Sequence, residues 1–213
     1  MIDVYDDVLE EHNAILIDDE VKKLRWSYDY RSNSKKVNKH WHILCGHDKE
    51  ECDKNAYAWA HSLFEVFMNK YDFVKKYKIE SYERIYCNAH THGIEPHIHA
   101  DDGDFTMIYY PRLDWETEWG GGTAIFEEFK NDRNSPYHKE ELKNLQIDKH
   151  VNYKGNRLIV FDAYLPHQAQ PVSRECYELR TNVVFKCNIS GARRERLDFY
   201  KQENGNGEPA DRY

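Results

Sequence analysis

From residue 81 onward the sequence is a series of short runs in which apolar and polar residues alternate, and this pattern limits the fold more than any other feature. A period of two is typical of β-strands, whose successive side chains point to opposite faces. Turn residues separate the runs, and no helix-length pattern lies between most of them, so βαβ winding is a poor fit. The pattern predicts a sandwich or barrel. The runs are YERIYCNA (82–89), HIHAD (97–101), FTMIYYP (105–111), TAIFEEF (123–129), RLIVFDA (157–163) and LRTNVVFK (179–186).

The first part of the chain has a helical period instead. Asp18 or Asp19 is placed to cap a helix that follows it. Residues 55–77 carry aromatic and aliphatic side chains at helical spacing, and such a stripe is suited to docking on a sheet. We therefore expect residues 1–80 to form a helical support region that packs on the strand-rich core.

Three other segments are polar and lack a strong period. Residues 32–52 are expected to be irregular, with a local histidine cluster at the surface. Residues 130–150 interrupt the strand-rich half with at most one helical turn, and an insertion of this length is typical of a lid or of a solvated surface loop. Residues 201–213 are expected to form a disordered tail, so the core spans 81–200. The histidine cluster consists of His40, His42 and His47.

Composition and charge narrow the possible functions. A hydrophobic fraction of 40% and a charged fraction of 32% in 213 residues fit one soluble globular domain. The formal net charge of −8 is unlike that of a general nucleic-acid binder, which is normally basic. The acidic N-terminus is no signal peptide, and no apolar run approaches membrane-spanning length. Five cysteines without a C-x-x-C pair argue against a disulfide framework and predict a reducing, cytoplasmic compartment.

A candidate metal site is the most specific chemical feature. His99 and Asp101 are two residues apart, so an extended backbone places an imidazole and a carboxylate on one face. A third ligand should come from a neighbouring strand, and His167 in YLPHQAQP is the candidate. Two histidines and one carboxylate on one face of a metal, with the other positions open, are typical of non-haem Fe(II) oxygenases. An H-x-D pair by itself also occurs as a surface histidine beside an acidic turn.

Residues elsewhere in the strand-rich half add to this pattern. Arg180 opens an otherwise apolar strand, and its planar guanidinium is suited to anchor a dicarboxylate that chelates the metal. Tyr110 shares a strand face with Thr106 and Ile108, and its hydroxyl either reaches the same carboxylate or belongs to a core tyrosine. The glycines at 120–122 let the backbone bend and approach neighbouring groups closely.

The order of these motifs resembles the 2-oxoglutarate- and Fe(II)-dependent oxygenases, and within them the prolyl 4-hydroxylase group. The matched pieces are H-x-D, T-x-IYY-xxx-DW, GG-xxx-IF, G-xx-LIVFD, H-xx-QP and an arginine, in that order over residues 81–190. The resemblance implies a mainly β fold with N-terminal helices, built as a double-stranded β-helix or jelly-roll barrel. It also implies decarboxylation of 2-oxoglutarate to succinate and CO₂, coupled to O₂-dependent hydroxylation of a C–H bond. The prolyl hydroxylase group favours a prolyl residue in a protein or peptide as the substrate.

The same resemblance implies roles for the site residues. His99, Asp101 and His167 would hold Fe(II), with ascorbate as an accessory reductant. Arg180 and Tyr110 would hold the far carboxylate of 2-oxoglutarate. The arginine lies several residues further from the distal histidine than in the hypoxia-sensing prolyl hydroxylases, so a bulge or longer turn is expected before it. The resemblance also gives Thr106 as a further contact to the far carboxylate, and it leaves Arg174 and Lys186 as lesser candidates for the anchor.

Four residues near these motifs have open assignments. Asn88 and Tyr86 alternate on the strand before the site, where they either orient the co-substrate or serve in the core. Trp115 and Arg112 follow the IYY strand and are candidates for substrate contact, although a packed loop anchor suits Trp115 better.

Three rival interpretations use the same residues differently. A cupin would use three histidines and a glutamate, and His97, His99 and His167 supply only the histidines. The HIHADD stretch is similar to the H-x-H-x-D-H motif of metallo-β-lactamase-like zinc enzymes, but Asp102 stands in place of the last histidine. A non-enzymatic binding domain with a vestigial site is the third. Within oxygenase chemistry, a free amino acid, another small molecule or a nucleobase is an alternative to a prolyl residue.

Overall fold

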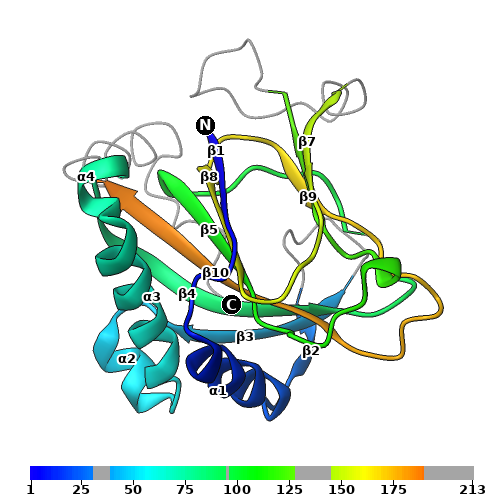
Figure 1. Cartoon of the computed structure of the whole chain (residues 1–213), viewed down its shortest axis with the longest axis horizontal. Coiled ribbons are helices and arrows are strands. Elements are labelled where there is room, and N and C mark those ends of the chain that lie inside the picture. Colours follow the sequence, from blue (N-terminus) through cyan, green and yellow to red (C-terminus); the bar gives the residue numbers. More distant parts are fainter. Residues whose placement is uncertain (31–38, 95, 128–144, 190–213) are drawn as a thin grey trace, which may run out of the picture.

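The strands form a large and a small antiparallel sheet in the computed structural model, which describes residues 1–30, 39–94, 96–127 and 145–189. The large sheet has the order β1-β8-β5-β10-β4-β3-β2, and the small sheet has the order β7-β6-β9 (Figure 1). The strands of the large sheet are β1 (Ile2–Tyr5), β2 (Ser27–Tyr30), β3 (His40–Gly46), β4 (Ile79–His90), β5 (Phe105–Tyr110), β8 (Arg157–Asp162) and β10 (Arg180–Ile189). Those of the small sheet are β6 (Thr123–Phe126), β7 (Ile147–Val151) and β9 (His167–Ala169).

Apolar side chains cover both faces of the large sheet. On one face the helices bury a cluster that includes Phe67 of α3 and Phe185 of β10. On the other face a second cluster joins Ile108 of β5 and Val184 of β10 to Ile125 of β6, so it lies between the two sheets. This mainly β, jelly-roll architecture confirms the predicted fold class. The helices are α1 (Glu11–Lys22), α2 (Lys49–Lys54), α3 (Ala58–Tyr71) and α4 (Phe73–Tyr77), with a 3₁₀ turn, η1 (Thr117–Trp119).

Strand β10 lies between β4 and β5 and gives the barrel interior a polar face. Its residues at even positions share one face, and Val184 shows that this face looks toward the small sheet. Arg180 is paired in register with His90 of β4, and Lys186 is paired with Thr106 of β5. The two cations therefore lie six residues apart on one face of β10.

The N-terminal region supplies strands as well as helices. Strand β1 pairs with β8, and β3 pairs with β4, so both are continuous with the large sheet. Helix α1 begins at Glu11, and Asp18 and Asp19 lie inside it, so the predicted N-cap is wrong. The buried carboxylate of Asp18 binds Lys22 at 2.9 Å, one helical turn away, instead of capping the helix.

The helix predicted over 55–77 is confirmed with a break. Asp72 has a φ of 48°, a left-handed conformation that ends α3 before α4 begins. The irregular structure predicted for 32–52 is wrong from residue 40 onward, where β3 and α2 form. His40 is buried on β3, and of the three clustered histidines only His47 is exposed. A polar strand at the rim of a barrel has no clean alternation, which is why its sequence resembles a loop.

Two predicted segments of the strand-rich half need comment. The HIHAD run is extended but is no regular strand, because a single bridge between His99 and His167 joins it to β9. The end of the 130–150 insertion belongs to β7, which pairs with β6. The remainder of that insertion up to residue 144, and the predicted tail at 201–213, lie outside the described residues.

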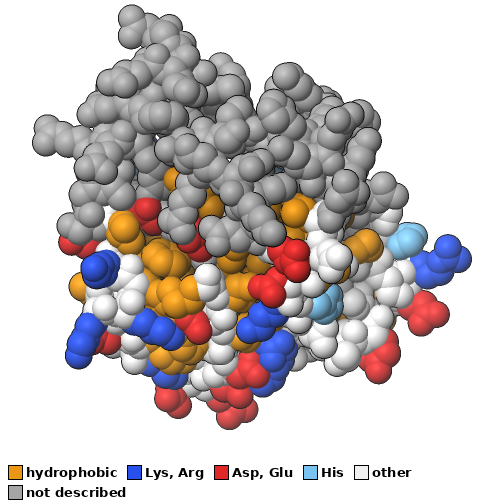
Figure 2. Space-filling view, turned by 90° about the horizontal axis from the view of Figure 1, so that it is seen from above, with side chains coloured by type: hydrophobic (Ala, Val, Ile, Leu, Met, Phe, Trp, Pro, Cys, Tyr) orange, Lys and Arg blue, Asp and Glu red, His pale blue; other side chains and the backbone are white. Residues whose placement is uncertain are grey.

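The described surface carries charges of both signs. Figure 2 shows acidic and basic side chains interspersed around hydrophobic ones among the residues that it colours. No helix among the described residues has the length and apolar character needed to cross a bilayer. The five cysteines are all free thiols, and four of them are buried.

Candidate active site

Three side chains predicted as metal ligands converge inside the barrel. The backbone N–H of His99 donates to the carbonyl of His167 at 3.1 Å, and the N–H of His167 donates to the carbonyl of His99 at 2.8 Å. Asp101 follows, with its N–H bonded to the carbonyl of Ala163 at 2.8 Å. One possible ligand atom from each of the three side chains lies within 4.8 Å of the others. The extended backbone thus brings the H-x-D pair and the distal histidine together, as their spacing predicts.

Backbone carbonyls determine which nitrogen of each imidazole faces the site. Nδ1 of His99 lies 3.0 Å from the carbonyl oxygen of His97, and Nδ1 of His167 lies 2.9 Å from that of Leu165. Because a carbonyl only accepts, each Nδ1 carries a proton, and Nε2 is the ring nitrogen that remains available to a metal. Both Nε2 atoms face Asp101, at 3.5 Å for His99 and 3.3 Å for His167. Two imidazole nitrogens and a carboxylate that converge on one point fit a divalent metal with open positions.

Burial and charge determine the protonation of these groups. Burial lowers the pKa of His99 to about 3, and His167 adds to this shift, so the imidazole is neutral at neutral pH. Burial alone would raise the pKa of Asp101, but the Lys186 ammonium, and then His167, hold it well below its usual range. Thr106 donates to Oδ2 of this carboxylate at 2.7 Å. His99 and Asp101 therefore have the deprotonated forms that a metal needs.

Arg180 is a buried cation without a carboxylate partner among the described residues. It has no exposed surface, and its Nε and Nη2 donate to the carbonyls of Gly121 and Gly122. Its Cζ lies 5.6 Å from the ring centroid of Tyr110 and 5.8 Å from that of Tyr153. Nη1 has no hydrogen-bond partner in the described part of the chain. A buried guanidinium with an unused donor is suited to an anionic ligand.

The two residues predicted to assist Arg180 lie in different places. Tyr110 stacks on Tyr153 at 4.2 Å, and its hydroxyl lies 2.6 Å from the Thr123 hydroxyl, beside the guanidinium. Thr106 lies at the other end of the strand, where it binds Asp101. The structure therefore places Tyr110 beside the Arg180 guanidinium and Thr106 beside Asp101.

The glycine-rich turn shapes the wall around Arg180. Gly121 has a φ of 73°, and a Cβ atom there would lie 3.2 Å from Cδ of Arg180 and 3.2 Å from the Trp115 ring. The indole N–H of Trp115 donates to the carbonyl of Gly120 at 3.0 Å, and its ring meets Trp119 edge-on at 5.1 Å. Trp115 is thus a packed anchor for this turn, the role that the sequence favoured over substrate contact.

Comparison with known proteins gives matches among solved structures only. No protein-family model and no curated protein sequence matches the chain. A prolyl hydroxylase from Trichoplax adhaerens, in complex with a peptide fragment of hypoxia inducible factor, is similar with a TM-score of 0.59 and 13% identity, over 92% of this chain and 86% of that one. A Pseudomonas putida prolyl-4-hydroxylase has a TM-score of 0.57 and 14% identity, over 89% and 93%. HygX from Streptomyces hygroscopicus, with nickel, 2-oxoglutarate and hygromycin B bound, has a TM-score of 0.59 and 11% identity, over 89% and 83%.

The chain has the prolyl hydroxylase fold. The matches cover about nine tenths of this chain, and they confirm the resemblance at the level of the fold. Identities of 11–14% carry no further conclusion about the reaction.

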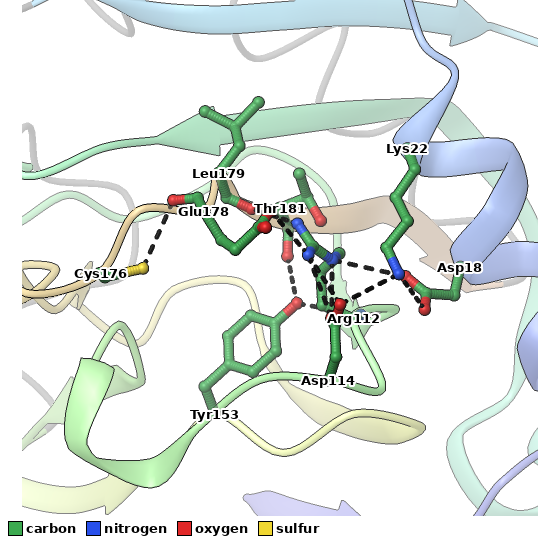
Figure 3. A network of polar contacts seen from close by, with 9 residues as sticks. All are labelled: Asp18, Lys22, Arg112, Asp114, Tyr153, Cys176, Glu178, Leu179 and Thr181. Carbon is green, nitrogen blue, oxygen red and sulfur yellow. Dashed lines mark hydrogen bonds and ion pairs between the residues drawn. The ribbon is translucent and has the colours of Figure 1, made fainter.

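Within the prolyl hydroxylase fold, Arg112 lies in a polar network, not at an open substrate surface (Figure 3). Its side chain is buried, and two of its nitrogens bind both oxygens of Asp114 at 3.1 Å. It also binds Glu178 at 2.9 Å and lies 3.5 Å from Asp18 of α1. An arginine already surrounded by three carboxylates has no charge to offer a substrate, so this placement speaks against the predicted substrate contact.

The longer turn predicted before the anchor arginine is part of the same network. The N–H of Cys176 donates to the carbonyl of Ser173 at 3.1 Å, which closes a turn, and Glu178 then binds Arg112. The carbonyl of Leu179 accepts from Arg112 at 3.2 Å (Figure 3). The inserted residues therefore form a fastened loop, and β10 begins directly after it with Arg180. The lesser anchor candidates are exposed, as for Arg174, or lie at the metal ligands, as for Lys186.

Polar groups missed by sequence reasoning line the interior beside Arg180. Asn88, an open assignment, is bonded to Nδ1 of His42 at 2.8 Å. His40, His90 and Asn182 are buried, and each has a polar atom without a hydrogen-bond partner among the described residues. Strand alternation could have predicted two of them. His90 follows Asn88 by two residues and Asn182 follows Arg180 by two, so each pair shares a strand face. The other open assignment, Tyr86, has its ring 5.7 Å from the Lys186 ammonium.

Proposed function

We propose that the chain is an Fe(II)- and 2-oxoglutarate-dependent dioxygenase that hydroxylates a C–H bond. The observation that carries this proposal is a single interior face with a His-Asp-His triad and a buried arginine whose Nη1 is unused. A metal chelated by a keto acid, with the far carboxylate on a guanidinium, would satisfy both features at once. Among proteins of the same fold, a HygX structure holds nickel and 2-oxoglutarate.

The site residues would divide the work as follows. His99, Asp101 and His167 would hold Fe(II), which supplies the O₂ chemistry when it is bound. Arg180 would donate from Nη1 to the far carboxylate of 2-oxoglutarate, and the hydroxyl of Tyr110 would turn from Thr123 to the same carboxylate or remain beside it. The chain itself would contribute the position and orientation of these ligands and of the co-substrate.

For the substrate, we propose a prolyl residue in a protein or peptide. The support is twofold: the sequence motifs resemble those of the prolyl hydroxylase group, and solved structures of this fold include prolyl hydroxylases, one of them in complex with a peptide fragment. We further propose a cytoplasmic location, in line with five free thiols.

The test is turnover by the purified chain with Fe(II), ascorbate, 2-oxoglutarate and proline-containing peptides in air. Succinate should form, and a peptide should gain the mass of one oxygen atom. Asp101→Ala should abolish succinate formation and metal binding together, because the remaining two imidazoles lack the anionic ligand.

His97→Ala is the matched control for that variant. The ring of His97 lies near that of His99, with centroids 5.6 Å apart, but His97 is not one of the three converging ligands. Most succinate formation should therefore survive. The reverse result, with His97 essential and Asp101 dispensable, would replace the proposal with the cupin-like alternative of three histidines.

A polar small molecule is a second candidate substrate, and a specific observation favours it. The interior beside Arg180 carries buried polar atoms without partners on His40, His90 and Asn182. Such atoms are costly unless a ligand or ordered water bonds to them. HygX, of the same fold, has been solved with hygromycin B bound. If proline-containing peptides neither raise succinate formation nor gain oxygen, while a hydroxyl-rich small molecule does both, this candidate takes precedence.

A further inference from the structure

Lys186 is a buried lysine placed directly against the proposed metal ligands. It is 1% exposed and reaches into the barrel from β10, opposite Thr106. Its ammonium forms an ion pair with Oδ2 of Asp101, the oxygen to which Thr106 also donates. Beyond this ion pair, Nζ has no hydrogen-bond partner among the described residues. Lysine is almost never fully buried unless it is paired, so this carboxylate determines where the ammonium lies.

The Asp101 carboxylate is both the partner of Lys186 and a proposed metal ligand. In the protein without metal, Lys186 offsets a buried charge on Asp101 that would otherwise be uncompensated. A divalent metal held by the triad would need the same carboxylate and would lie close to the ammonium. The metal and the ammonium are both positive, and like charges that lie close together repel strongly in a buried site, where the effective dielectric constant is far below that of water.

The charges of the interior increase this conflict. Arg180 is a second buried cation, with no carboxylate partner among the described residues, and imidazoles bind a metal in their neutral form. Two cations and one carboxylate give this face a charge of +1, and a divalent metal would raise it to +3. A dianionic keto acid that chelates the metal and reaches Arg180 would return it to +1.

We infer that Lys186 competes with the metal for Asp101 and thereby makes metal retention depend on the anionic co-substrate. The inference rests on the proposed function and adds a regulatory property to that site. Lys186 is a positioning residue in this account, since it acts through Asp101 and not on a substrate. Coupling between two ligands is reciprocal, so the metal should strengthen co-substrate binding by the same factor.

The expected result compares metal affinity with and without 2-oxoglutarate, in the unmodified protein and in Lys186 variants. In the unmodified protein, 2-oxoglutarate should tighten metal binding strongly. In Lys186→Met, metal binding without 2-oxoglutarate should tighten about tenfold, within the usual range of coupling between sites. The enhancement that 2-oxoglutarate adds should shrink correspondingly, while Lys186→Arg, which keeps the charge, should retain most of it.

The measurement needs no turnover. Mn(II) is titrated into metal-free protein without O₂, with and without 2-oxoglutarate, and free Mn(II) is followed by electron paramagnetic resonance. Lys186→Gln is a second neutral variant that keeps a polar head, in case the methionine variant does not fold. Lys49→Met is the matched control, because Lys49 is exposed and pairs with Asp53 on α2, far along the chain from the site.

Each outcome decides the inference. Tighter Mn(II) binding and weaker enhancement in a neutral variant, with neither change in Lys49→Met, would support it. Unchanged or weaker Mn(II) binding in both neutral variants would overturn it and leave Lys186 as a structural counter-charge. Failure of every protein, including the unmodified one, to bind Mn(II) would remove the proposed metal site and the inference with it, so the two failures are distinguishable.

Discussion

Two buried arginines of this molecule, Arg112 and Arg180, have opposite surroundings. Arg112 lies among the carboxylates of Asp18, Asp114 and Glu178 (Figure 3). Arg180 donates to backbone carbonyls and lies near aromatic rings, and one of its nitrogens has no partner among the described residues. In isolation the sequence assigns both arginines to the site. The difference in partners separates an arginine that fastens the fold from one that is held ready for an anion.

The comparison also shows how the first arginine serves the second. The Arg112 network fastens helix α1, the turn after β5 and the loop that leads into β10 (Figure 3). Arg180 is the first residue of β10, so the preceding loop helps to determine its backbone position. A site that must hold a guanidinium without a carboxylate needs such external support, because the buried charge itself opposes folding.

The largest expected effect is on stability, from Arg112→Met. Removing this cation leaves the buried carboxylate of Asp18 with Lys22 alone. We expect a loss of about 3 kcal/mol, at the low end for a broken buried pair because Asp114 and Glu178 are partly exposed. Urea unfolding followed by circular dichroism measures it, with the exposed Arg25→Met as control. A loss no greater than the control's would contradict the structural role.

The next effect is on co-substrate affinity, from Arg180→Lys. The lysine keeps the charge but loses the planar fork, and one charge-assisted hydrogen bond is worth about 1.5–3 kcal/mol. Binding of 2-oxoglutarate should weaken roughly tenfold to a hundredfold. Calorimetric titration without O₂ reads this directly. If Arg174→Lys, at an exposed position, gave the large loss and Arg180→Lys none, the anchor would be Arg174.

A pair of glycine substitutions separates backbone strain from contact with Arg180. Gly121 and Gly93 both have positive φ, 73° and 87°, so alanine at either position should cost about 1–2 kcal/mol of strain. A Cβ atom at Gly93 meets nothing within 4 Å, whereas one at Gly121 meets Arg180 and Trp115. Gly121→Ala should therefore cost about 1 kcal/mol more in thermal unfolding and also weaken 2-oxoglutarate binding. Equal effects of the two variants would mean that the Arg180 and Trp115 side chains move aside at little cost when a Cβ atom is added at Gly121.

The sequence predicted the site better than its surroundings because the site depends on parity. Alternation along an extended backbone places His99 and Asp101 on the same side of one segment, and it places Arg180 and Lys186 on the same side of a second segment. The role of Arg112 depends instead on which distant carboxylates the fold brings to it. Asp18 comes from a helix and Glu178 from a loop, and no local pattern joins them to this arginine.

The rim of the barrel was mispredicted for a related physical reason. His40 and His42 lie on β3, in a stretch whose polar residues resemble a loop. A strand that lines a polar interior has hydrophilic side chains facing inward, so the usual sign of a half-buried strand is missing. The pairing of β3 with β4, which only the tertiary structure supplies, decides the matter.

The smallest expected effect tests whether the two arginines are linked. Glu178→Gln keeps the shape of the side chain but removes one carboxylate from Arg112, at a position about a third exposed, 35%. A partly exposed pair contributes under about 1 kcal/mol, so stability should fall only slightly. If the loop positions Arg180, the free energy of 2-oxoglutarate binding should still change by about 0.5 kcal/mol, which is a roughly twofold weaker binding.

Glu175→Gln, in the same turn but exposed, is the matched control. Amide hydrogen exchange at the start of β10 should rise in Glu178→Gln and not in Glu175→Gln, because only the former weakens the contact between Arg112 and the loop before that strand. Equal exchange and equal affinity in the two variants would show that β10 holds Arg180 without help from the network around Arg112.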